Sequence, residues 1–345
     1  MKEFGSDFHR IAASPSGSIR LTGIYPNSVM LASGRQCIVA LVKQYGWRRL
    51  WMPDLFCHDV IESIKRQTGV EIALYADNPL FECRVEQLPF KAGDALLRMN
   101  FFGMRGIRSN EAVPVPVIED HSHDPLGLWA RGSNADWCIS SIRKTLPLPE
   151  GGLVWSPKGY VLSPMPGASR ENEAIAAERW RAMEQKTLYL ENKLDDKEGF
   201  RRLFVETEEW FDHSKPVTID ERSRTFISDS FDIGEWQNAK RRNWHLLEKI
   251  IDRTHCNLLK AEDDACTMFS LVLMFPSKER RNEVRSKLIG ASVYPAVLWA
   301  VPDDVTVSAE TKCFSEQMLS VHCDGRYSGD DARQMASILN LVLEE

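Results

Sequence analysis

Residues 117–155 contain the side chains of this sequence whose types and spacing most clearly suggest chemistry. An apolar run ends in Glu119 and Asp120, and a second short run, WCIS, is soon followed by Arg143 and Lys144. Both runs are typical of buried strands, so an acid and an amine each lie at or just after a strand end. A lysine amine can form a Schiff base with pyridoxal phosphate, and a carboxylate can pair with the pyridine nitrogen of that cofactor. The pattern favours an enzyme of this kind.

The loop between the two runs holds two histidines, His121 and His123, in the sequence HSHD. Such a cluster resembles a group of metal ligands, but no second group of ligands has a suitable spacing, so we predict no metal site. The eight cysteines are scattered and never form a CxxC pair, which indicates free, mostly buried thiols rather than a zinc site or a disulfide framework. They are Cys37, Cys57, Cys83, Cys138, Cys256, Cys266, Cys313 and Cys323.

These residues need a scaffold, and the first half of the sequence predicts one. Helical and strand-like patterns alternate up to about residue 160, with strands expected at 49–53, 71–79, 95–103, 113–120 and 137–140. This alternation is typical of an α/β fold, in which helices cover a mostly parallel sheet and sites form at the carboxyl ends of the strands. Asn100 and Asp120 lie at two such ends.

A helix is predicted from Ser33 to Gly46, because Ser33 is a favoured N-cap residue and Gly46 is a typical stop. The free N–H groups at the start of a helix can bind a phosphate, although a Ser-Gly start is more often simply a cap. Residues 1–26 are rich in Ser, Gly and Pro and are expected to form an arm and an entry loop, so this helix would be the first regular element.

The second half predicts a long helix within 164–196, an irregular polar segment at 217–232, and a helix from about residue 236. A strand at 266–275 and helices at 277–290 and 330–343 then form a smaller α+β unit. We therefore expect three parts: an N-terminal arm (1–26), a large α/β domain (27–240) and a small C-terminal domain (241–345).

The amino-acid composition limits the classes of molecule that the protein is expected to bind. The 345 residues include 43 Lys and Arg against 49 Asp and Glu, a formal net charge of -6, and 43% are hydrophobic. A chain of this size can bury a large core, and its mild acidity provides no basic patch for nucleic acid or an anionic membrane, so we expect small-molecule substrates. The first residues lack the apolar stretch of a signal peptide and no apolar run is long enough to span a bilayer, so a cytoplasmic location is expected.

The motifs together resemble a known family. They are SGR at 33–35, MPDLFC at 52–57, NFFG at 100–103, IEDHSH at 118–123, SSIRKTLPLPEGG at 140–152 and LSVHCDGRYSGDDARQMASIL at 319–339. In this order the sequence is similar to the DegT-type sugar aminotransferases, which have the aspartate-aminotransferase fold of pyridoxal phosphate enzymes (fold type I). The resemblance is clearest at 118–152 and weakest at 160–260. It implies a large domain with a mostly parallel seven-stranded sheet and a smaller C-terminal α+β domain.

The resemblance also implies roles for individual residues. Lys144 matches the lysine that forms the Schiff base and later moves a proton, which requires a lowered pKa. Asp120 matches the acid that keeps the pyridine nitrogen protonated. Glu119 is the rival carboxylate, but it points to the opposite side of an extended chain and is expected to be structural. His123 matches a Gln or His beside the ring hydroxyl of the cofactor, whereas His121 has no counterpart.

The phosphate is expected to bind Ser33, Gly34 and the Ser140-Ser141 pair. The family usually has a serine five residues before its lysine, and Ile139 takes that position here, so which serine serves stays open. An aromatic side chain should cover the cofactor ring. Phe56 is our prediction, although an ungapped match would place Cys57 there.

Members of this family are implied to be homodimers that share their active sites, often through an asparagine from the partner subunit. The corresponding segment here, near 223–230, has no asparagine. Arg222 or Arg224 could replace it, and of the two we predict Arg224 as a cofactor contact.

The function that the resemblance implies is transfer of an amino group from an amino acid such as glutamate to a keto-sugar, which by analogy is linked to a nucleotide. The alternative is a non-transaminating relative, either an elimination or dehydration enzyme or a catalytically silent binding protein.

Overall fold

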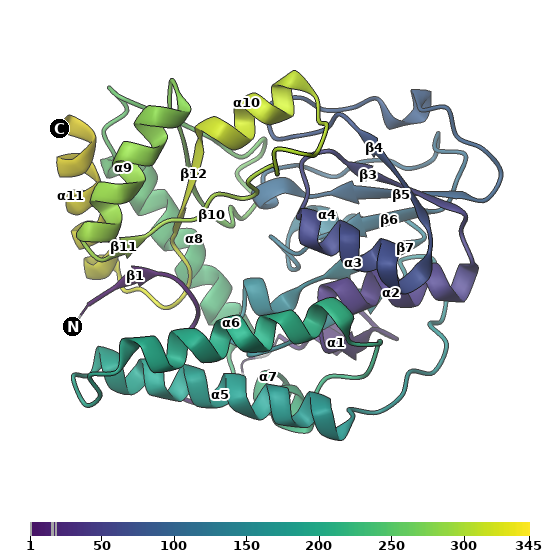
Figure 1. Cartoon of the computed structure of the whole chain (residues 1–345), viewed down its shortest axis with the longest axis horizontal. Helices are drawn as coiled ribbons and strands as arrows, with labels where there is room; N and C mark the ends of the chain where they lie inside the picture. The colour runs from purple at the N-terminus through teal and green to yellow at the C-terminus, as the bar shows by residue number, and fades with distance from the viewer. Residues whose placement is uncertain (1, 15–16, 18) are drawn as a thin grey trace.

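The computed structural model describes residues 2–14, 17 and 19–345, and a seven-stranded sheet forms its centre (Figure 1). The strand order is β2-β8-β7-β6-β5-β3-β4, and the pairs from β4 to β7 are parallel, while β8 is antiparallel to both β7 and β2. This confirms the predicted mostly parallel α/β sheet. The strands are β2 (Val29–Leu31), β3 (Arg49–Pro53), β4 (Glu71–Tyr75), β5 (Asp94–Met99), β6 (Val117–Asp120), β7 (Trp137–Ser140) and β8 (Gly152–Trp155).

The register of the sheet brings several chemically useful residues to one edge. Met99 of β5 pairs with Asp120 of β6, and Asp120 pairs with Ile139 of β7. All residues of these three strands are buried, as expected for parallel strands that are covered on both faces. The residues that follow the strands, Asn100 and Ser141 among them, therefore meet at the carboxyl edge beside Asp120.

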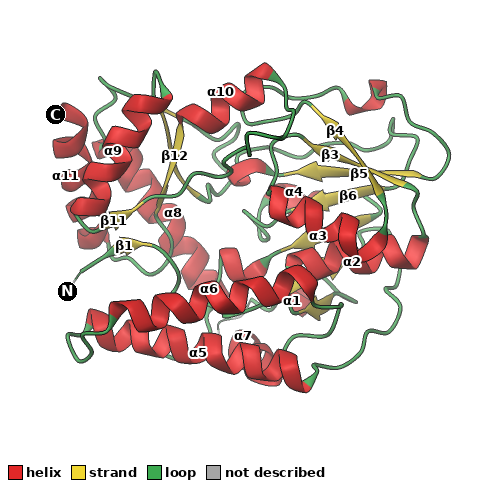
Figure 2. Cartoon of the chain, in the orientation of Figure 1, coloured by secondary structure: helices red, strands yellow, loops and turns green. Residues whose placement is uncertain are grey.

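Helices cover both faces of this sheet (Figure 2). One core includes apolar residues of α2 (Gly34–Tyr45) and α3 (His58–Thr68), and the other includes residues of α5 (Arg170–Leu190) and α6 (Lys197–His213). The predicted limits of α2 are confirmed: the Ser33 hydroxyl accepts from the Gln36 N–H, and Gly46 ends the helix at φ 61°. A single α-helical turn, α4 (Leu128–Gly132), and the 3₁₀ helices η1 (Val85–Gln87), η2 (Phe101–Gly103) and η3 (Ile142–Lys144) fill the connections.

Two predictions about secondary structure are wrong. The segment at 217–232 contains a helix, α7 (Glu221–Asp229), which begins at an Asp220 cap and buries mainly Ser223 and Ile227. So little buried apolar surface leaves a weak helical pattern in the sequence. Regular structure also precedes α2, because β1 (Phe4–Gly5), α1 (Leu21–Ile24) and β2 lie before it. Residues 1, 15, 16 and 18 of the expected arm lie outside the described residues.

The C-terminal part contains a second, three-stranded sheet of order β12-β10-β9. Its strands pair antiparallel, and β1 pairs with the short strand β11 (Val293–Tyr294), so the N-terminus joins this part of the molecule (Figure 1). The remaining elements are α8 (Ile233–Ile250), β9 (Asn257–Leu258), β10 (Ser270–Met274), α9 (Lys278–Gly290), α10 (Ala309–Gln317), β12 (Met318–His322) and α11 (Gly329–Glu344). The predicted domain boundary after residue 240 falls inside α8 and stays a prediction.

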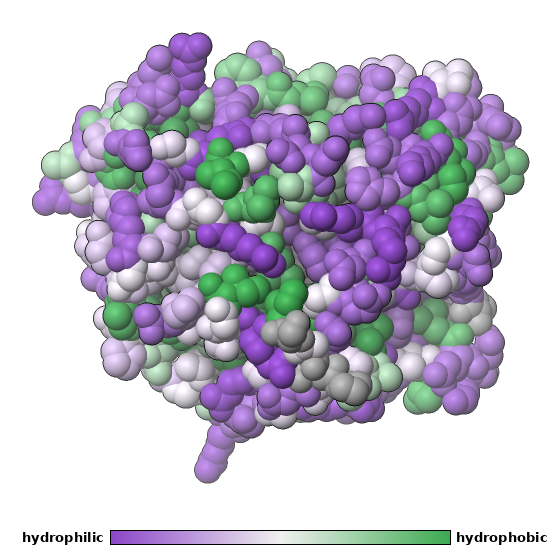
Figure 3. Space-filling view, turned by 180° about the vertical axis from the view of Figure 1, so that it is seen from behind, coloured by the Kyte–Doolittle hydropathy of each residue, from purple (hydrophilic) through white to green (hydrophobic). Residues whose placement is uncertain are grey.

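Figure 3 shows the face opposite to that of Figure 1, where hydrophilic residues cover most of the surface and hydrophobic residues form separate patches. Among the described residues, no helix has both the length and the apolar character needed to cross a membrane.

Candidate active site

A small cavity lies at the carboxyl edge of the large sheet, between the N-terminus of α2 and the segment after β7. Its volume is about 50 Å³. Many of the predicted cofactor contacts line it, from four separate stretches of chain: Ser33, Gly34, Phe56, Asp120, Ser141 and Lys144. Cys57, Ser122, Arg143 and Trp299 are further lining residues. The fold therefore gathers residues that lie more than 260 positions apart in the sequence.

Asp120 ends β6 and is buried, with 5% of its surface exposed. The Ser122 N–H donates to its Oδ1 atom at 2.8 Å. Burial raises the pKa of Asp120, although the hydrogen bond from Ser122 and the charge of Lys144 act in the opposite direction. A carboxylate held in such a site is stabilised by a cationic or protonated partner, such as a pyridinium nitrogen.

Lys144 is the last residue of η3 and is partly buried. Burial lowers the pKa of its amine, opposed by the neighbouring Cys57 and Asp120. Its Nζ atom lies 5.1 Å from the centre of the Trp299 ring. A lowered pKa increases the fraction of neutral amine, which is the nucleophilic form and the form that can accept a proton.

The start of α2 packs unusually close to the end of β7. A Cβ atom added at Gly34 would lie 2.8 Å from Cβ of Ser141 and 3.0 Å from its Cα and N atoms, so a glycine allows this approach. The first N–H groups of α2 have no partner within the helix itself, and Ser33, Gly34 and Ser141 at this helix start line the cavity. Such a helix start suits a phosphate.

Ser140 and Ser141, the two candidate phosphate contacts, differ in whether they line the small cavity. Ser141 lines the small cavity, and its N–H donates to the Ser122 hydroxyl at 2.7 Å. Ser140 is fully buried and is not among the described residues that line the cavity. In the part of the chain that the structure describes, its hydroxyl has no hydrogen-bond partner. The geometry therefore favours Ser141 over Ser140 as the phosphate contact.

His123 is fully buried and borders a second, larger cavity of about 390 Å³, which Lys144 also lines. The Phe102 N–H donates to Nδ1 of His123 at 2.9 Å, so Nε2 carries the proton of the neutral ring. Within the described residues this Nε2 atom has no partner. Burial lowers the pKa of His123 well below its usual value, and Lys144 and Lys240 add to the effect. His123 is thus a neutral N–H donor.

Aromatic rings stack beside this donor. The His123 ring lies 4.5 Å from that of Phe269 and 5.5 Å from that of Trp299, measured between ring centres, and Phe56 lies 5.8 Å from Trp299. Both Phe56 and Cys57 line the small cavity, so the choice between them as the cover of the cofactor ring stays open. Trp299 was not predicted, since no motif surrounds it in the sequence.

The predicted arginine contact lies elsewhere in this chain. Arg224 is exposed on α7 and forms an ion pair with Glu221, while Arg222 pairs with Glu184 at 2.7 Å. Among the described residues that line the two cavities, neither arginine is present. A contact from Arg224 to the site of a partner subunit stays a prediction.

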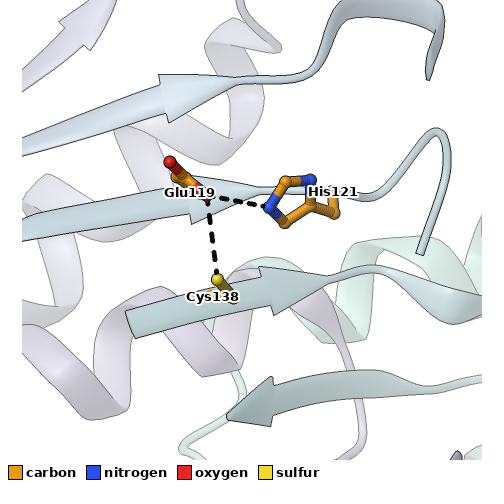
Figure 4. Close-up of side chains that lie close together, drawn as sticks. All are labelled: Glu119, His121 and Cys138. Atoms are coloured by element: carbon orange, nitrogen blue, oxygen red, sulfur yellow. Dashed lines mark hydrogen bonds and ion pairs between the residues drawn. The ribbon is translucent and has the colours of Figure 1, made fainter. Parts of the chain in front are cut away.

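Glu119 and His121 belong to a separate buried group with Cys138 (Figure 4). Nε2 of His121 lies 3.2 Å from Oε2 of Glu119, and the Asn110 amide donates to Oε1 at 2.7 Å. Burial acts to raise the pKa of Glu119, but His121, Ser133 and Asn110 outweigh it and lower the pKa. Both carboxylate oxygens of Glu119 thus have a partner, as expected if Glu119 is structural, whereas Nδ1 of His121 has none among the described residues. They could also ligate a metal, so the prediction of no metal stays untested.

A scan against protein-family models gives no match, and a search of curated proteins gives none. Solved structures do match. A Streptococcus pneumoniae protein named as a sugar aminotransferase, Spr1654 in its PMP form, has a TM-score of 0.65 at 12% identity, covering 94% of this chain and 90% of that one. PseC of Helicobacter pylori, an aminotransferase of pseudoaminic acid biosynthesis, has a TM-score of 0.63 at 10% identity over 99% and 100%.

The chain has the fold of the sugar aminotransferases. Aminotransferase TlmJ of Streptoalloteichus hindustanus also shares it, with a TM-score of 0.59 at 9% identity over 94% of this chain and 89% of that one. The similarity extends over nearly the whole chain, and it confirms the fold that the sequence motifs imply.

Proposed function

We propose that this protein is a pyridoxal phosphate-dependent aminotransferase that moves an amino group from an amino acid, glutamate, to a nucleotide-linked keto-sugar. One observation carries the proposal: Asp120 and Lys144 line the same cavity, whose other side is the N-terminus of α2 with Ser33. A carboxylate, an amine and a phosphate-binding helix start are the three groups that this cofactor requires. The fold shared with sugar aminotransferases supports it.

The residues fit the cofactor in chemistry. Ser33, Gly34 and Ser141 would hold its phosphate, and Asp120 its pyridine nitrogen. The otherwise unpartnered Nε2–H of His123, considered among the described residues, would donate to its ring hydroxyl. When bound, pyridoxal phosphate supplies an electron sink for a carbanion. The cavity of about 50 Å³ is smaller than the cofactor, and the adjoining cavity of about 390 Å³, which Lys144, His123 and Trp299 also line, offers further space.

Each residue of the site has a task that its surroundings explain. Asp120 would keep the pyridine nitrogen protonated, because a buried carboxylate stabilises the charged form of a cationic partner. Lys144 would provide the amine that holds the cofactor. Burial lowers the pKa of this amine, which increases its neutral fraction, so that Nζ could also accept a proton from the substrate carbon and return it to the cofactor.

The proposal includes a homodimer with active sites at the subunit interface. The sequence resemblance supports it, together with the exposed position of Arg224, which leaves this cation accessible to another chain. Sedimentation of the cofactor-bound protein tests this part. A fully active species of the monomer mass, 39.3 kDa, would refute it.

The main experiment compares Lys144→Ala with Lys158→Ala, a control whose exposed amine pairs with Asp136 on the surface. Pyridoxal phosphate added to the control should give a visible absorbance band that glutamate changes, and borohydride should fix the cofactor to Lys144. The Lys144→Ala protein should lose both while remaining folded. Attachment of the cofactor to another lysine would refute the assignment of Lys144. A separate screen, in which the control protein is incubated with keto nucleotide-sugars and the products are analysed by mass, should identify the acceptor.

A further inference from the structure

One face of α6 presents two carboxylates to three arginines beside the active site. Glu208 and Asp212 are four residues apart and therefore lie on the same side of the helix. Arg143 donates to Oε1 of Glu208 at 2.5 Å, and Arg179 lies 3.3 Å from Oε2. Arg35, from the first turn of α2, forms an ion pair with Asp212. Each arginine comes from a different element, so only the folded chain assembles the group.

Glu208 bridges two guanidinium groups that are held firmly in place. Nε of Arg179 donates to the Pro149 carbonyl oxygen at 2.7 Å, and both Arg143 and Arg179 lie over the Phe211 ring, at 5.0 and 5.5 Å from its centre. Such cation–π contacts fix the plane of a guanidinium group. The Glu208 side chain, by contrast, is 42% exposed and is not enclosed in the same way.

The group has more positive than negative charge. Three arginines face two carboxylates, which leaves one positive charge in excess. Asp7 borders the same cavity and its charge acts on both Arg143 and Arg179, but it is exposed to solvent and, among the described residues, forms no ion pair with either. Arg326 has its own partner in Asp324. In the described part of the chain, the buried Nε atom of Arg143 has no hydrogen-bond partner. The cluster is therefore able to bind a further anion.

The charges within the cluster change the pKa values of both Arg179 and Glu208. Burial lowers the pKa of Arg179, and the neighbouring charge of Arg143 helps to bring it to about 10. Burial alone would raise the pKa of Glu208, but Arg143 and Arg179 outweigh it and lower the pKa to about 2. Glu208 thus stays ionised and bound to the arginines at any physiological pH.

The position of the cluster connects it to the chemistry. Arg143, Arg179 and Glu208 line the cavity of about 390 Å³ that also contains Lys144 and His123. The same three residues line an outer, more open cavity of about 730 Å³ along α6. Arg143 and Arg179 therefore border both the cavity that contains Lys144 and the outer cavity.

We propose that Arg143 and Arg179 bind an oxyanion of the substrate, a carboxylate or a phosphate, and that Glu208 competes with this anion for the two guanidinium groups. Two fixed guanidinium groups offer paired N–H donors, which match the oxygen atoms of either anion. The identity of the anion as part of a substrate rests on the proposed function, whereas the binding itself does not.

The test measures anion binding to the cofactor-free protein by calorimetry, with glutarate and inorganic phosphate as probes. Glu208→Gln removes the competing charge, and Glu206→Gln is the matched control. Glu206 lies two residues away on α6, is exposed, and lies 3.9 Å from Arg202. Of the two cavities it borders only the outer one, and among the described residues it forms no hydrogen bond or ion pair with Arg143 or Arg179. Both variants change the net charge equally, and they differ in that only Glu208 contacts Arg143 and Arg179 and lines the cavity that contains Lys144.

Glu208→Gln should bind at least one probe about tenfold more tightly than the Glu206→Gln control, and Arg143→Gln in that background should abolish the gain. Tighter glutarate binding indicates a carboxylate substrate, and tighter phosphate binding a phosphorylated one. Equal affinities in the two Glu variants would overturn the proposal. A gain in phosphate affinity that disappears when pyridoxal phosphate is bound would also overturn it, because the anion would then be that of the cofactor. Failure of Lys144 to react would refute the proposed function alone.

Discussion

Gly34 provides a direct test of the site geometry, because Gly329 occupies the same helix position in less crowded surroundings. Gly34 and Gly329 are each the first residue of a helix, α2 and α11, and each follows a serine cap. A Cβ atom at Gly329 would lie 3.7 Å or more from its nearest neighbours, both in the Arg333 side chain. At Gly34 it would lie 2.8 Å from Cβ of Ser141 and 3.0 Å from its backbone.

These distances determine the expected change in the free energy of unfolding for each variant. An alanine that fits without strain stabilises a protein by about 0.4–1 kcal/mol, because it restricts the unfolded chain. An additional methyl group in a tightly packed place costs about 1–3 kcal/mol. We therefore expect Gly329→Ala to raise the free energy of unfolding slightly, and Gly34→Ala to lower it by up to about 2.6 kcal/mol after both effects.

Urea unfolding of the two variants and the parent protein measures these differences. A second assay titrates pyridoxal phosphate: pushing α2 away from Ser141 should weaken cofactor binding in Gly34→Ala and leave it unchanged in Gly329→Ala. If both variants are equally stable and bind the cofactor equally well, the close approach of α2 to β7 is not as described. A loss of stability with normal cofactor affinity would place the phosphate elsewhere.

Three further predictions use the same protein. Asp120→Asn should fold and bind pyridoxal phosphate but lose transamination by about two orders of magnitude or more, because the pyridine proton is no longer held; near-normal turnover would move this role to another acid. Trp299→Ala should speed cofactor association in stopped-flow absorbance, since Trp299 narrows the cavity, and an unchanged or slower rate would contradict this account. Burial lowers the pKa of Lys186 to about 8, with Arg326 adding to the effect. Below pH 8 this lysine is protonated in both the folded and unfolded states, while between about 8 and 10.5 the unfolded state binds more protons. Its contribution to stability should therefore increase with pH in that window, by at most about 3 kcal/mol, and Lys186→Met should remove this slope in urea unfolding at each pH.

The amino-acid sequence alone determined the elements that depend on neighbouring residues. The Ser33 cap and the Gly46 stop predicted α2, and the apolar runs predicted β3 and β7 with their observed limits. Such signals are local, because capping and side-chain periodicity act within a few residues. The expected proximity of Asp120 and Lys144 also came from the sequence, since parallel strands end at one edge of a sheet.

The tertiary structure decided which side chains meet at that edge. It placed Ser141 at the cavity and Ser140 away from it, because neighbouring residues around a strand end point in different directions. The role of Ser141 as a phosphate contact stays a prediction. It also added Trp299, Arg179 and Glu208, which come from segments that no local motif connects to Lys144. Their positions depend on how α5, α6 and the loop after β11 pack against the sheet. Packing between distant segments leaves no pattern in a single sequence, so these residues could be found only in the folded chain.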